Sequence, residues 1–275
     1  MDEILKSALL GFIQGLTEFL PVSSSGHLAI LHKVTGLETE SNLFFDIILH
    51  LATMIAVIIY YRNTIKDIIS GGIYGTRKLI KGESIKDAFF KSKDSKFFSL
   101  IIIGSIPTAI IGLTYKDTVE KFADNLFYVG IALLVTAILL ISFELKRRAF
   151  KKINRMSALD AVIIGIVQGI AIIPGISRSG STIATAKFLS IDKETAASYS
   201  FLLSLPAIGG AFLIGLKDVI GTGFNVDPFI IGVGFVTALI TGYFSLKLLV
   251  WMIKKSNMYF FAVYCIGIAI FAMMY

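Results

Sequence analysis

The fold is decided by two stretches of sequence, QGLTEFLPVSSSGH at residues 14–27 and QGIAIIPGISRSGST at residues 168–182. Each follows an apolar run, contains a proline and ends in a turn rich in serine and glycine. The two stretches are in register, because one offset of 154 residues relates both Gln14 to Gln168 and the glycines near their ends. Matching interruptions in two halves of a chain predict one site built between internal repeats.

Composition places the chain in a membrane. Its 275 residues are 55% hydrophobic and 16% charged, with a mean hydropathy of +0.80, whereas soluble domains are about a quarter charged. The net charge of +7 does not indicate nucleic acid, because the basic residues lie in loops between apolar runs. One cysteine excludes a disulfide framework and a cysteine-based metal site. The three histidines do not have the HExxH spacing of a zinc site.

Apolar runs predict the crossings. Six are long enough to cross a bilayer, at about 43–61, 97–115, 126–143, 195–216, 228–252 and 258–275. Two more, about 7–20 and 158–173, are short and end at prolines, and each is followed by a second short arm, near 28–35 and 182–190. Short apolar helices broken by proline predict re-entrant segments, which are tolerated where they are buried in protein or line a wet cavity.

Basic residues concentrate in four of the loops. Of the 26 lysines and arginines, 19 lie in segments 62–96, 144–157, 187–194 and 252–257. The remaining loops and the N-terminal segment hold 4 basic and 9 acidic residues. The positive-inside rule therefore makes 62–96 and 144–157 basic cytoplasmic loops and puts both termini outside. We expect a short amphipathic or surface helix within 62–96.

These counts predict an all-α polytopic membrane protein. Residues 1–275 form one integral membrane domain with two inverted-topology repeats, 1–143 and 158–275. Each repeat is a re-entrant helix-loop-helix followed by three transmembrane helices, and the first half enters from outside whereas the second enters from the cytoplasm.

Two ionisable residues lie inside the re-entrant stretches, Glu18 in the first and Arg178 in the second. An ionisable group at membrane depth is costly and marks a candidate site, although a buried structural ion pair is the alternative. Gln14 is one turn from Glu18 and shares its helical face. Gln14 is either a ligand for a metal ion or water, or a helix-packing hydrogen-bond donor matched by Gln168.

The turns that follow the prolines have the composition of an anion site. Serines at a helix start cap its free N–H groups, and a helix N-terminus attracts phosphate. Arg178 adds a guanidinium suited to bidentate binding of phosphate. Two facing helix N-termini predict a phosphate or diphosphate site, although each serine taken singly is explained by capping alone. The predicted substrate-binding residues are Gln14, Ser23, Ser25, Gly26, Gly175, Ser177, Ser179, Gly180 and Thr182.

A carboxylate in an anion site needs a separate explanation. Glu18 would repel phosphate, so its presence indicates a divalent cation, a proton transfer, or both. His27 follows Ser24 by three residues, and a hydroxyl, an imidazole and a carboxylate together indicate hydrolysis. A packing role for His27 is the alternative. His50 lies in an apolar run, but it precedes Ser204 by the same 154 residues, which is compatible with a place in the lining.

The whole chain resembles the undecaprenyl-diphosphate phosphatase family, also called the bacitracin resistance protein family. The resemblance is carried by residues 14–27 and by PGISRSGST at 174–182. It implies hydrolysis of undecaprenyl diphosphate to undecaprenyl phosphate and inorganic phosphate, which recycles the lipid carrier for peptidoglycan. It also implies a divalent cation (Mg²⁺ or Ca²⁺), a plasma-membrane location and a site that opens to the outer face.

Residue roles follow from the same resemblance. It implies that Glu18 is the essential carboxylate and the possible metal ligand, that Ser24 and His27 are catalytic, and that Arg178 binds the diphosphate. The family often has Glu where this chain has Gln14, so the resemblance does not imply a mechanism with two carboxylates. We expect Ser24 as nucleophile with His27 as base, and direct attack by water or a phosphohistidine at His27 stays open.

A transporter or flippase of an anionic lipid is the alternative function, because inverted repeats with broken helices also build transporters. A transporter needs an anion site but no nucleophile beside a base. The expected partners are the polyprenyl diphosphate and the bilayer, with no nucleic acid, and the oligomeric state stays open, a homodimer included.

Overall fold

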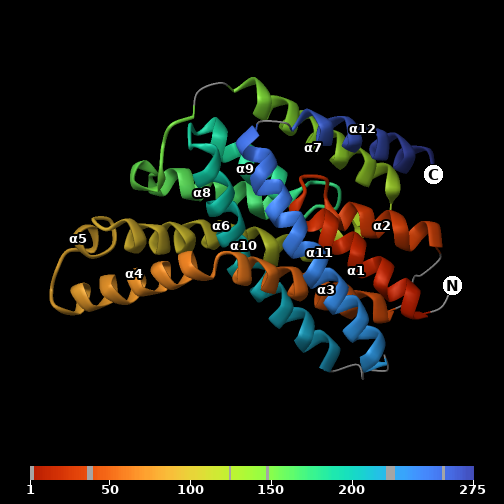
Figure 1. Cartoon of the computed structure of the whole chain (residues 1–275), viewed down its shortest axis with the longest axis horizontal. Helices are drawn as coiled ribbons and strands as arrows, with labels where there is room; N and C mark the ends of the chain where they lie inside the picture. The colour runs from red at the N-terminus through yellow and green to blue at the C-terminus, as the bar shows by residue number, and fades with distance from the viewer. Residues whose placement is uncertain (1–2, 36–39, 124, 147–148, 221–226, 256–257) are drawn as a thin grey trace.

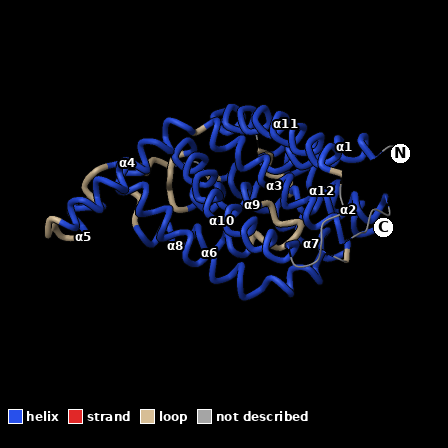
Figure 2. The backbone as a smooth tube through the Cα atoms, turned by 90° about the horizontal axis from the view of Figure 1, so that it is seen from below, coloured by secondary structure: helices blue, strands red, loops and turns tan. Residues whose placement is uncertain are grey.

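The structure is a computed structural model that describes residues 3–35, 40–123, 125–146, 149–220, 227–255 and 258–275. These residues form α-helices and one 3-10 helix, without a β-strand, as Figures 1 and 2 show. The predicted all-helical class is confirmed. The helices are α1 (Glu3–Phe19), α2 (Ser24–Thr35), α3 (Glu40–Tyr60), α4 (Arg62–Ile80), α5 (Ile85–Phe89), α6 (Lys93–Ala123), α7 (Leu126–Leu145), η1 (Ile153–Arg155), α8 (Ala158–Ile170), α9 (Arg178–Phe188), α10 (Lys193–Ile220), α11 (Pro228–Lys255) and α12 (Tyr259–Met274).

Four of the six predicted crossings are long, apolar helices in the part of the chain that the structure describes. They cover Lys93–Tyr115, Leu126–Leu145, Lys193–Lys217 and Pro228–Lys255. The first predicted crossing is Phe45–Tyr60, which meets α4 at a bend of 81°. The last, α12, has 16 residues, a length of about 24 Å, which is shorter than the roughly 30 Å hydrocarbon core. The molecule is therefore a multi-pass membrane protein.

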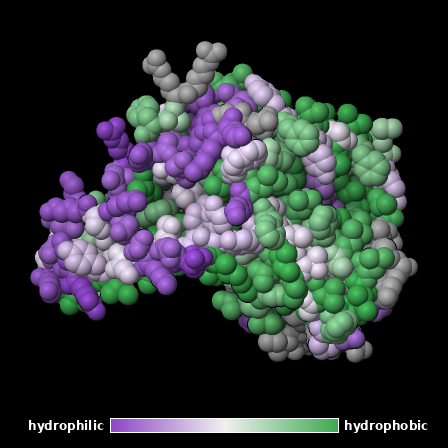
Figure 3. All heavy atoms as spheres, viewed as in Figure 1, coloured by the Kyte–Doolittle hydropathy of each residue, from purple (hydrophilic) through white to green (hydrophobic). Residues whose placement is uncertain are grey.

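The basic segment 62–96 is more helical than expected. In place of a connector with one short helix, it contains α4 with 19 residues, then α5 and the start of α6. Helix α4 packs on α6 through its glycines, and a Cβ added to Gly71 or Gly72 would clash with Ser95 or Phe98. The hairpin projects from the apolar body, and Figure 3 shows hydrophilic residues over much of this projection. Loop 62–96 is thus an ordered helical hairpin.

The two stretches predicted to be re-entrant are helix-loop-helix units. Helix α1 ends at Phe19 before Pro21, and α8 ends at Ile170 before Pro174. The second arms, α2 and α9, begin about four residues earlier than predicted, directly after the capping serines. Ser177 accepts a hydrogen bond from the Gly180 N–H at 3.1 Å, and Ser23 caps α2 in the same way. The predicted capping role of these serines is confirmed.

The first helix of each unit packs on a long apolar helix from the other half of the chain. Helix α1 lies along α11, and α8 lies along α6; Figures 1 and 2 both show α1 beside α11. Small residues allow the backbones to approach closely, as in other membrane helix pairs. A Cβ on Gly15 would lie 2.6 Å from the Ala238 carbonyl oxygen, and one on Gly169 would lie 2.8 Å from Ile111. These contacts fix the positions of α1 and α8, and therefore of the loops that follow them.

The remaining crossings also pair between the halves. Helix α3 packs on α10, and α7 packs on α12. The largest buried cluster includes aromatic residues from several of these helices, among them Phe19, Phe143 and Phe201. The two loops therefore meet inside a frame to which both halves contribute.

Candidate active site

The two loops touch each other. The Gly175 N–H donates a hydrogen bond to Ser23 Oγ at 3.1 Å, and Gly26 faces the Gly175 backbone so closely that an added Cβ would lie 3.1 Å from its Cα. Gly175 has a φ of +98° and Ser23 a φ of +69°, a left-handed conformation that favours glycine. The contact brings together the starts of α2 and α9, as the register of the two stretches predicted.

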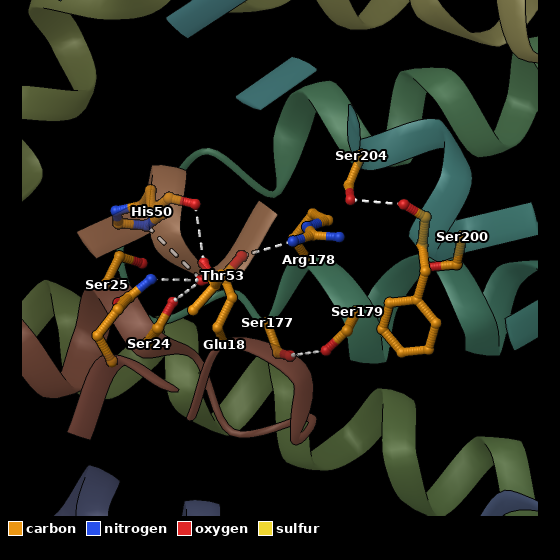
Figure 4. A network of polar contacts seen from close by, with 12 residues as sticks. Glu18, Ser24, Ser25, His50, Thr53, Ser177, Arg178, Ser179, Ser200 and Ser204 are labelled. Carbon is orange, nitrogen blue, oxygen red and sulfur yellow. Dashed lines mark hydrogen bonds and ion pairs between the residues drawn. The ribbon is translucent and has the colours of Figure 1, made fainter. Parts of the chain in front are cut away.

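Glu18 is the centre of the polar contacts at this junction. Its Oε1 accepts from Arg178 Nη2 at 2.5 Å. Its Oε2 accepts from Ser24 Oγ at 2.6 Å and from Gln14 Nε2 at 3.0 Å. Figure 4 shows Glu18 between Arg178 on one side and Ser24 on the other. The carboxylate therefore links a cation from one half of the chain to a hydroxyl from the other.

A cavity of about 210 Å³ opens beside Glu18. Of the predicted site residues, six line it: Glu18, Ser23, Ser24, Ser25, Ser177 and Arg178. Others predicted for the site do not line it: Gln14, Gly26, His27, Gly175, Ser179, Gly180 and Thr182. Part of the wall is apolar and comes from the second loop and α10: Ala171, Ile172, Ile176, Ala207, Ile208 and Ala211. The cavity thus has a charged, hydroxyl-rich side and an apolar side.

Arg178 has one guanidinium nitrogen to spare. Nη2 binds Glu18, whereas Nη1 is buried and has no hydrogen-bond partner among the described residues. The side chain is 15% exposed. A buried, unpartnered donor costs free energy unless a ligand satisfies it. The geometry is that of an arginine held by Glu18 with donors left for an anion.

Several predicted residues outside the cavity support those that line it. Gln14 donates to Glu18 and leaves its own Oε1 without a partner among the described residues. Thr182 Oγ1 donates to the Arg178 carbonyl at 2.7 Å and contacts Ser200 Oγ at 2.5 Å. Ser179 contacts the capping Ser177. These side chains hold the catalytic candidates through contacts behind the cavity.

His27 is placed differently from the prediction that paired it with Ser24. Its Nδ1 bonds to the Ser23 carbonyl at 2.7 Å, and its Nε2 bonds to Tyr264 Oη at 2.8 Å. Both ring nitrogens are therefore occupied, and His27 does not line the cavity. The backbone carbonyl one turn back binds one ring nitrogen, and a tyrosine on α12 binds the other. The spacing of residues in the sequence predicted neither contact.

His50 does line the cavity, as does Ser204 at the matching position of the second half. His50 Nε2 lies 3.6 Å from Glu18 Oε2, and Figure 4 shows the ring on the Ser24 side of the carboxylate. The offset of 154 residues was the signal for both positions. Thr108 also lines the cavity, and no motif in the sequence indicated it.

The residues around Glu18 do not fit a protein-held divalent ion. No group of three or more His, Cys, Asp or Glu side chains suited to a metal occurs among the described residues. Arg178 occupies one oxygen of Glu18, and Ser24 and Gln14 occupy the other. A cation bound there would also face the guanidinium at close range. We therefore derive no step through an ion held by Glu18.

Comparison with known proteins gives a consistent picture. A family model described as bacitracin resistance protein BacA matches residues 7–271. A protein of Methanosphaera stadtmanae named undecaprenyl-diphosphatase is 43% identical, with 98% of this chain and 97% of the relative covered. Proteins with the same name from Halothermothrix orenii and Methanobrevibacter smithii are 40% and 38% identical, each with 98% of this chain and 97% of the relative covered.

Proposed function

This chain belongs to the bacitracin resistance protein BacA family, and we propose that it hydrolyses undecaprenyl diphosphate to undecaprenyl phosphate and inorganic phosphate. Several relatives that match it over nearly their whole length carry the name undecaprenyl-diphosphatase. Such an activity would recycle the lipid carrier for cell-wall synthesis and contribute to bacitracin resistance.

One observation supports the proposal most directly. The buried Glu18 carboxylate accepts a hydrogen bond from the Ser24 hydroxyl while its other oxygen holds Arg178. A hydroxyl whose proton already points at a carboxylate is prepared to become a nucleophile. A guanidinium with a spare donor is prepared to bind phosphate. A binding site alone explains Arg178 but not the contact between Ser24 and Glu18.

The roles follow from these contacts. Arg178 Nη1 and the free N–H groups at the starts of α2 and α9 hold the diphosphate and stabilise charge that develops during transfer. Ser24 Oγ attacks the terminal phosphorus, and Glu18 Oε2 takes its proton. The bond from that phosphorus to the bridging oxygen breaks, and its electron pair leaves on undecaprenyl phosphate. Apolar residues such as Ile208 and Ile172 face the start of the polyprenyl tail.

The test is phosphate release from undecaprenyl diphosphate by the purified protein in detergent. We expect Glu18→Gln, Ser24→Ala and Arg178→Ala each to lower the rate by about 100-fold or more. Ser142→Ala is the matched control, because that hydroxyl donates within α7, to the Ile138 carbonyl, and does not line the cavity. A folded parent protein that binds the lipid without releasing phosphate would contradict the proposal and favour the transporter function.

Divalent-cation dependence is a separate part of the proposal. Mg²⁺ is commonly bound by substrate phosphates with few protein ligands, and a diphosphate offers such oxygens. We propose that Mg²⁺ or Ca²⁺ enters on the substrate. EDTA should then stop phosphate release without changing the thermal stability of the substrate-free protein. A stability loss on chelation would instead indicate an ion held by the protein.

We also propose the inverted-repeat topology, with repeats 1–143 and 158–275, both termini outside and a site that opens to the outer face. The basic residues of 62–96 and 144–157 support the orientation. The exchanged packing of α1 on α11 and of α8 on α6 supports the repeat. Epitope tags at the two termini should be accessible in intact cells, whereas a tag in the α4–α5 turn should require permeabilisation.

A further inference from the structure

His50 presents one ring nitrogen to the catalytic carboxylate. Its Nδ1 lies 2.8 Å from the Asp46 carbonyl oxygen, one turn back on α3. A carbonyl only accepts, so Nδ1 carries a hydrogen, and the lone pair of the neutral ring is on Nε2. Nε2 is the atom that lies 3.6 Å from Glu18 Oε2. The hydrogen bond to the backbone therefore fixes the tautomer with its basic nitrogen toward the reaction.

The surroundings of His50 leave this nitrogen free to exchange protons. The charged side chains that share the cavity wall with it are Glu18 from α1 and Arg178 from α9. Helix α10 contributes Ser204 and apolar residues, and α11 contributes no side chain to the wall. On α3 itself, the Asp46 carboxylate turns to His32, at 3.2 Å.

His50 is the more exposed of the two residues where they line the cavity. The His50 side chain is 32% exposed, whereas that of Glu18 is 6% exposed. A buried carboxylate that takes a proton from Ser24 has poor access to solvent, but an imidazole beside it has such access. His50 is thus placed between the reacting groups and the water that must enter and lose a proton.

We propose that His50 is a catalytic residue, the general base that activates water in the second half of the reaction. The inference rests on the proposed hydrolysis with Ser24 as nucleophile. After the first step the phosphoryl group is on Ser24 Oγ, and Glu18 Oε2 holds the serine proton. Both Ser24 Oγ and His50 Nε2 adjoin Glu18 Oε2, so a phosphoryl group on Ser24 lies beside the imidazole.

In the second step, water attacks the phosphoryl group on Ser24. The oxygen of water forms a bond to phosphorus, and His50 Nε2 takes one of its protons while the other stays on the inorganic phosphate. The bond between Ser24 Oγ and phosphorus breaks with its electron pair on Oγ. Ser24 then takes back its proton from Glu18 Oε2, and the imidazolium of His50 releases the proton to solvent. The enzyme returns to its starting state.

His27 is a positioning residue in this scheme. A carbonyl only accepts, so His27 Nδ1 donates to Ser23, and Nε2 accepts from the Tyr264 hydroxyl. The imidazole therefore ties the Ser23 carbonyl, in a residue with a φ of +69°, to α12. It holds the start of α2 in place so that Ser24 faces Glu18.

A matched pair of substitutions separates the two histidines. In asparagine, Nδ2 takes the position of histidine Nδ1, whereas nothing takes the position of Nε2. His50→Asn therefore keeps the donor to Asp46 and loses the base, and His27→Asn keeps the donor to Ser23 and loses the bond to Tyr264. Purified variants are given undecaprenyl diphosphate labelled in its terminal phosphate. Released undecaprenyl phosphate, released label and label on the protein are measured after an acid quench.

We expect His50→Asn to release one equivalent of undecaprenyl phosphate per protein in a burst and to retain acid-stable label. Its steady phosphate release should fall by about 100-fold to 10,000-fold. Free imidazole should restore that release in His50→Ala. His27→Asn should lower both half-reactions together, by no more than about 10-fold, an effect in the range of one ordinary hydrogen bond, without retained label.

Two results would overturn the inference. One is His50→Asn turnover within a few-fold of the parent with no retained label. The other is a burst, retained label and rescue by imidazole in the His27 variants. Ser24→Ala distinguishes failure of the underlying mechanism, because normal turnover by that variant removes the proposed nucleophile. An inactive Ser24→Ala beside a normal His50→Asn removes His50 alone.

Discussion

The ion pair between Glu18 and Arg178 should show strong thermodynamic coupling, and a double-substitution cycle measures it. Glu18→Gln removes the negative charge, Arg178→Ala removes the positive charge, and the double variant removes both. The two side chains are 6% and 15% exposed, and Nη2 lies 2.5 Å from Oε1. Removing one partner of a buried pair leaves the other charge uncompensated, which costs about 3–5 kcal/mol.

The double variant should be much more stable than additivity predicts. Replacing a buried ion pair as a whole is often nearly neutral, because the desolvation penalties disappear with the charges. Glu18 also accepts from Ser24 and Gln14, and glutamine keeps one acceptor for them. We therefore expect single losses of about 3 kcal/mol each and a coupling energy of about 2–3 kcal/mol, which is within the range for groups in contact.

The measurement is thermal unfolding of the purified protein in one detergent, with phosphate release recorded on the same samples. The expected pattern is a double variant about as stable as either single variant, in place of an additive loss, and without recovery of activity. Additive losses would refute the argument, because they would mean that solvent or lipid compensates each charge separately. Recovered activity would show that neither side chain takes part in the chemistry.

Three further predictions concern packing and capping, each measured by thermal unfolding. Gly15→Ala should destabilise the protein, because its methyl group would meet the backbone of α11, whereas Gly112→Ala has open space and should not; equal effects would contradict close packing of α1. Lys187→Met should cost about 1.5–3 kcal/mol, because Nζ donates to the Phe143 carbonyl and lies 3.8 Å from that ring's centroid; an unchanged midpoint would refute this role. Ser177→Ala should cost about 1 kcal/mol through loss of the cap on α9, and Ser177→Gly should cost less.

The sequence predicted that the two loops meet because the same motif occurs once in each half of the chain. The offset of 154 residues relates whole motifs, and it also relates His50 to Ser204, both of which line the cavity. Hydropathy and the capping serines predicted the positions of most of the helices, because both are local properties of the sequence. The long crossings follow from these patterns, whereas the second arms begin about four residues earlier than the patterns indicated.

The choice between the two histidines could not be predicted in the same way. In the spacing, His27 is close to Ser24, but its ring bonds to Tyr264, which is 237 residues away. His50 lies in an apolar run, and its approach to Glu18 depends on how α3 packs beside α1. Helix α4 was underestimated for a similar reason, because its glycines become informative only when α6 lies against them. Such contacts depend on tertiary packing and leave no local pattern.

The exchanged packing of the re-entrant helices has a consequence for synthesis of the chain. Helix α8 is synthesised after its partner α6, and Thr108 on α6 bonds to the Gly165 carbonyl only 57 residues later. Helix α1 is synthesised long before its partner α11, because Ser7 bonds to the Ile230 carbonyl 223 residues later. At about 5–20 residues per second, that wait is on the order of ten to forty-five seconds. During this interval α1 can pack on α2 and α3 but not on its main partner α11, so the insertion machinery or lipid must cover that face of α1 until α11 is made.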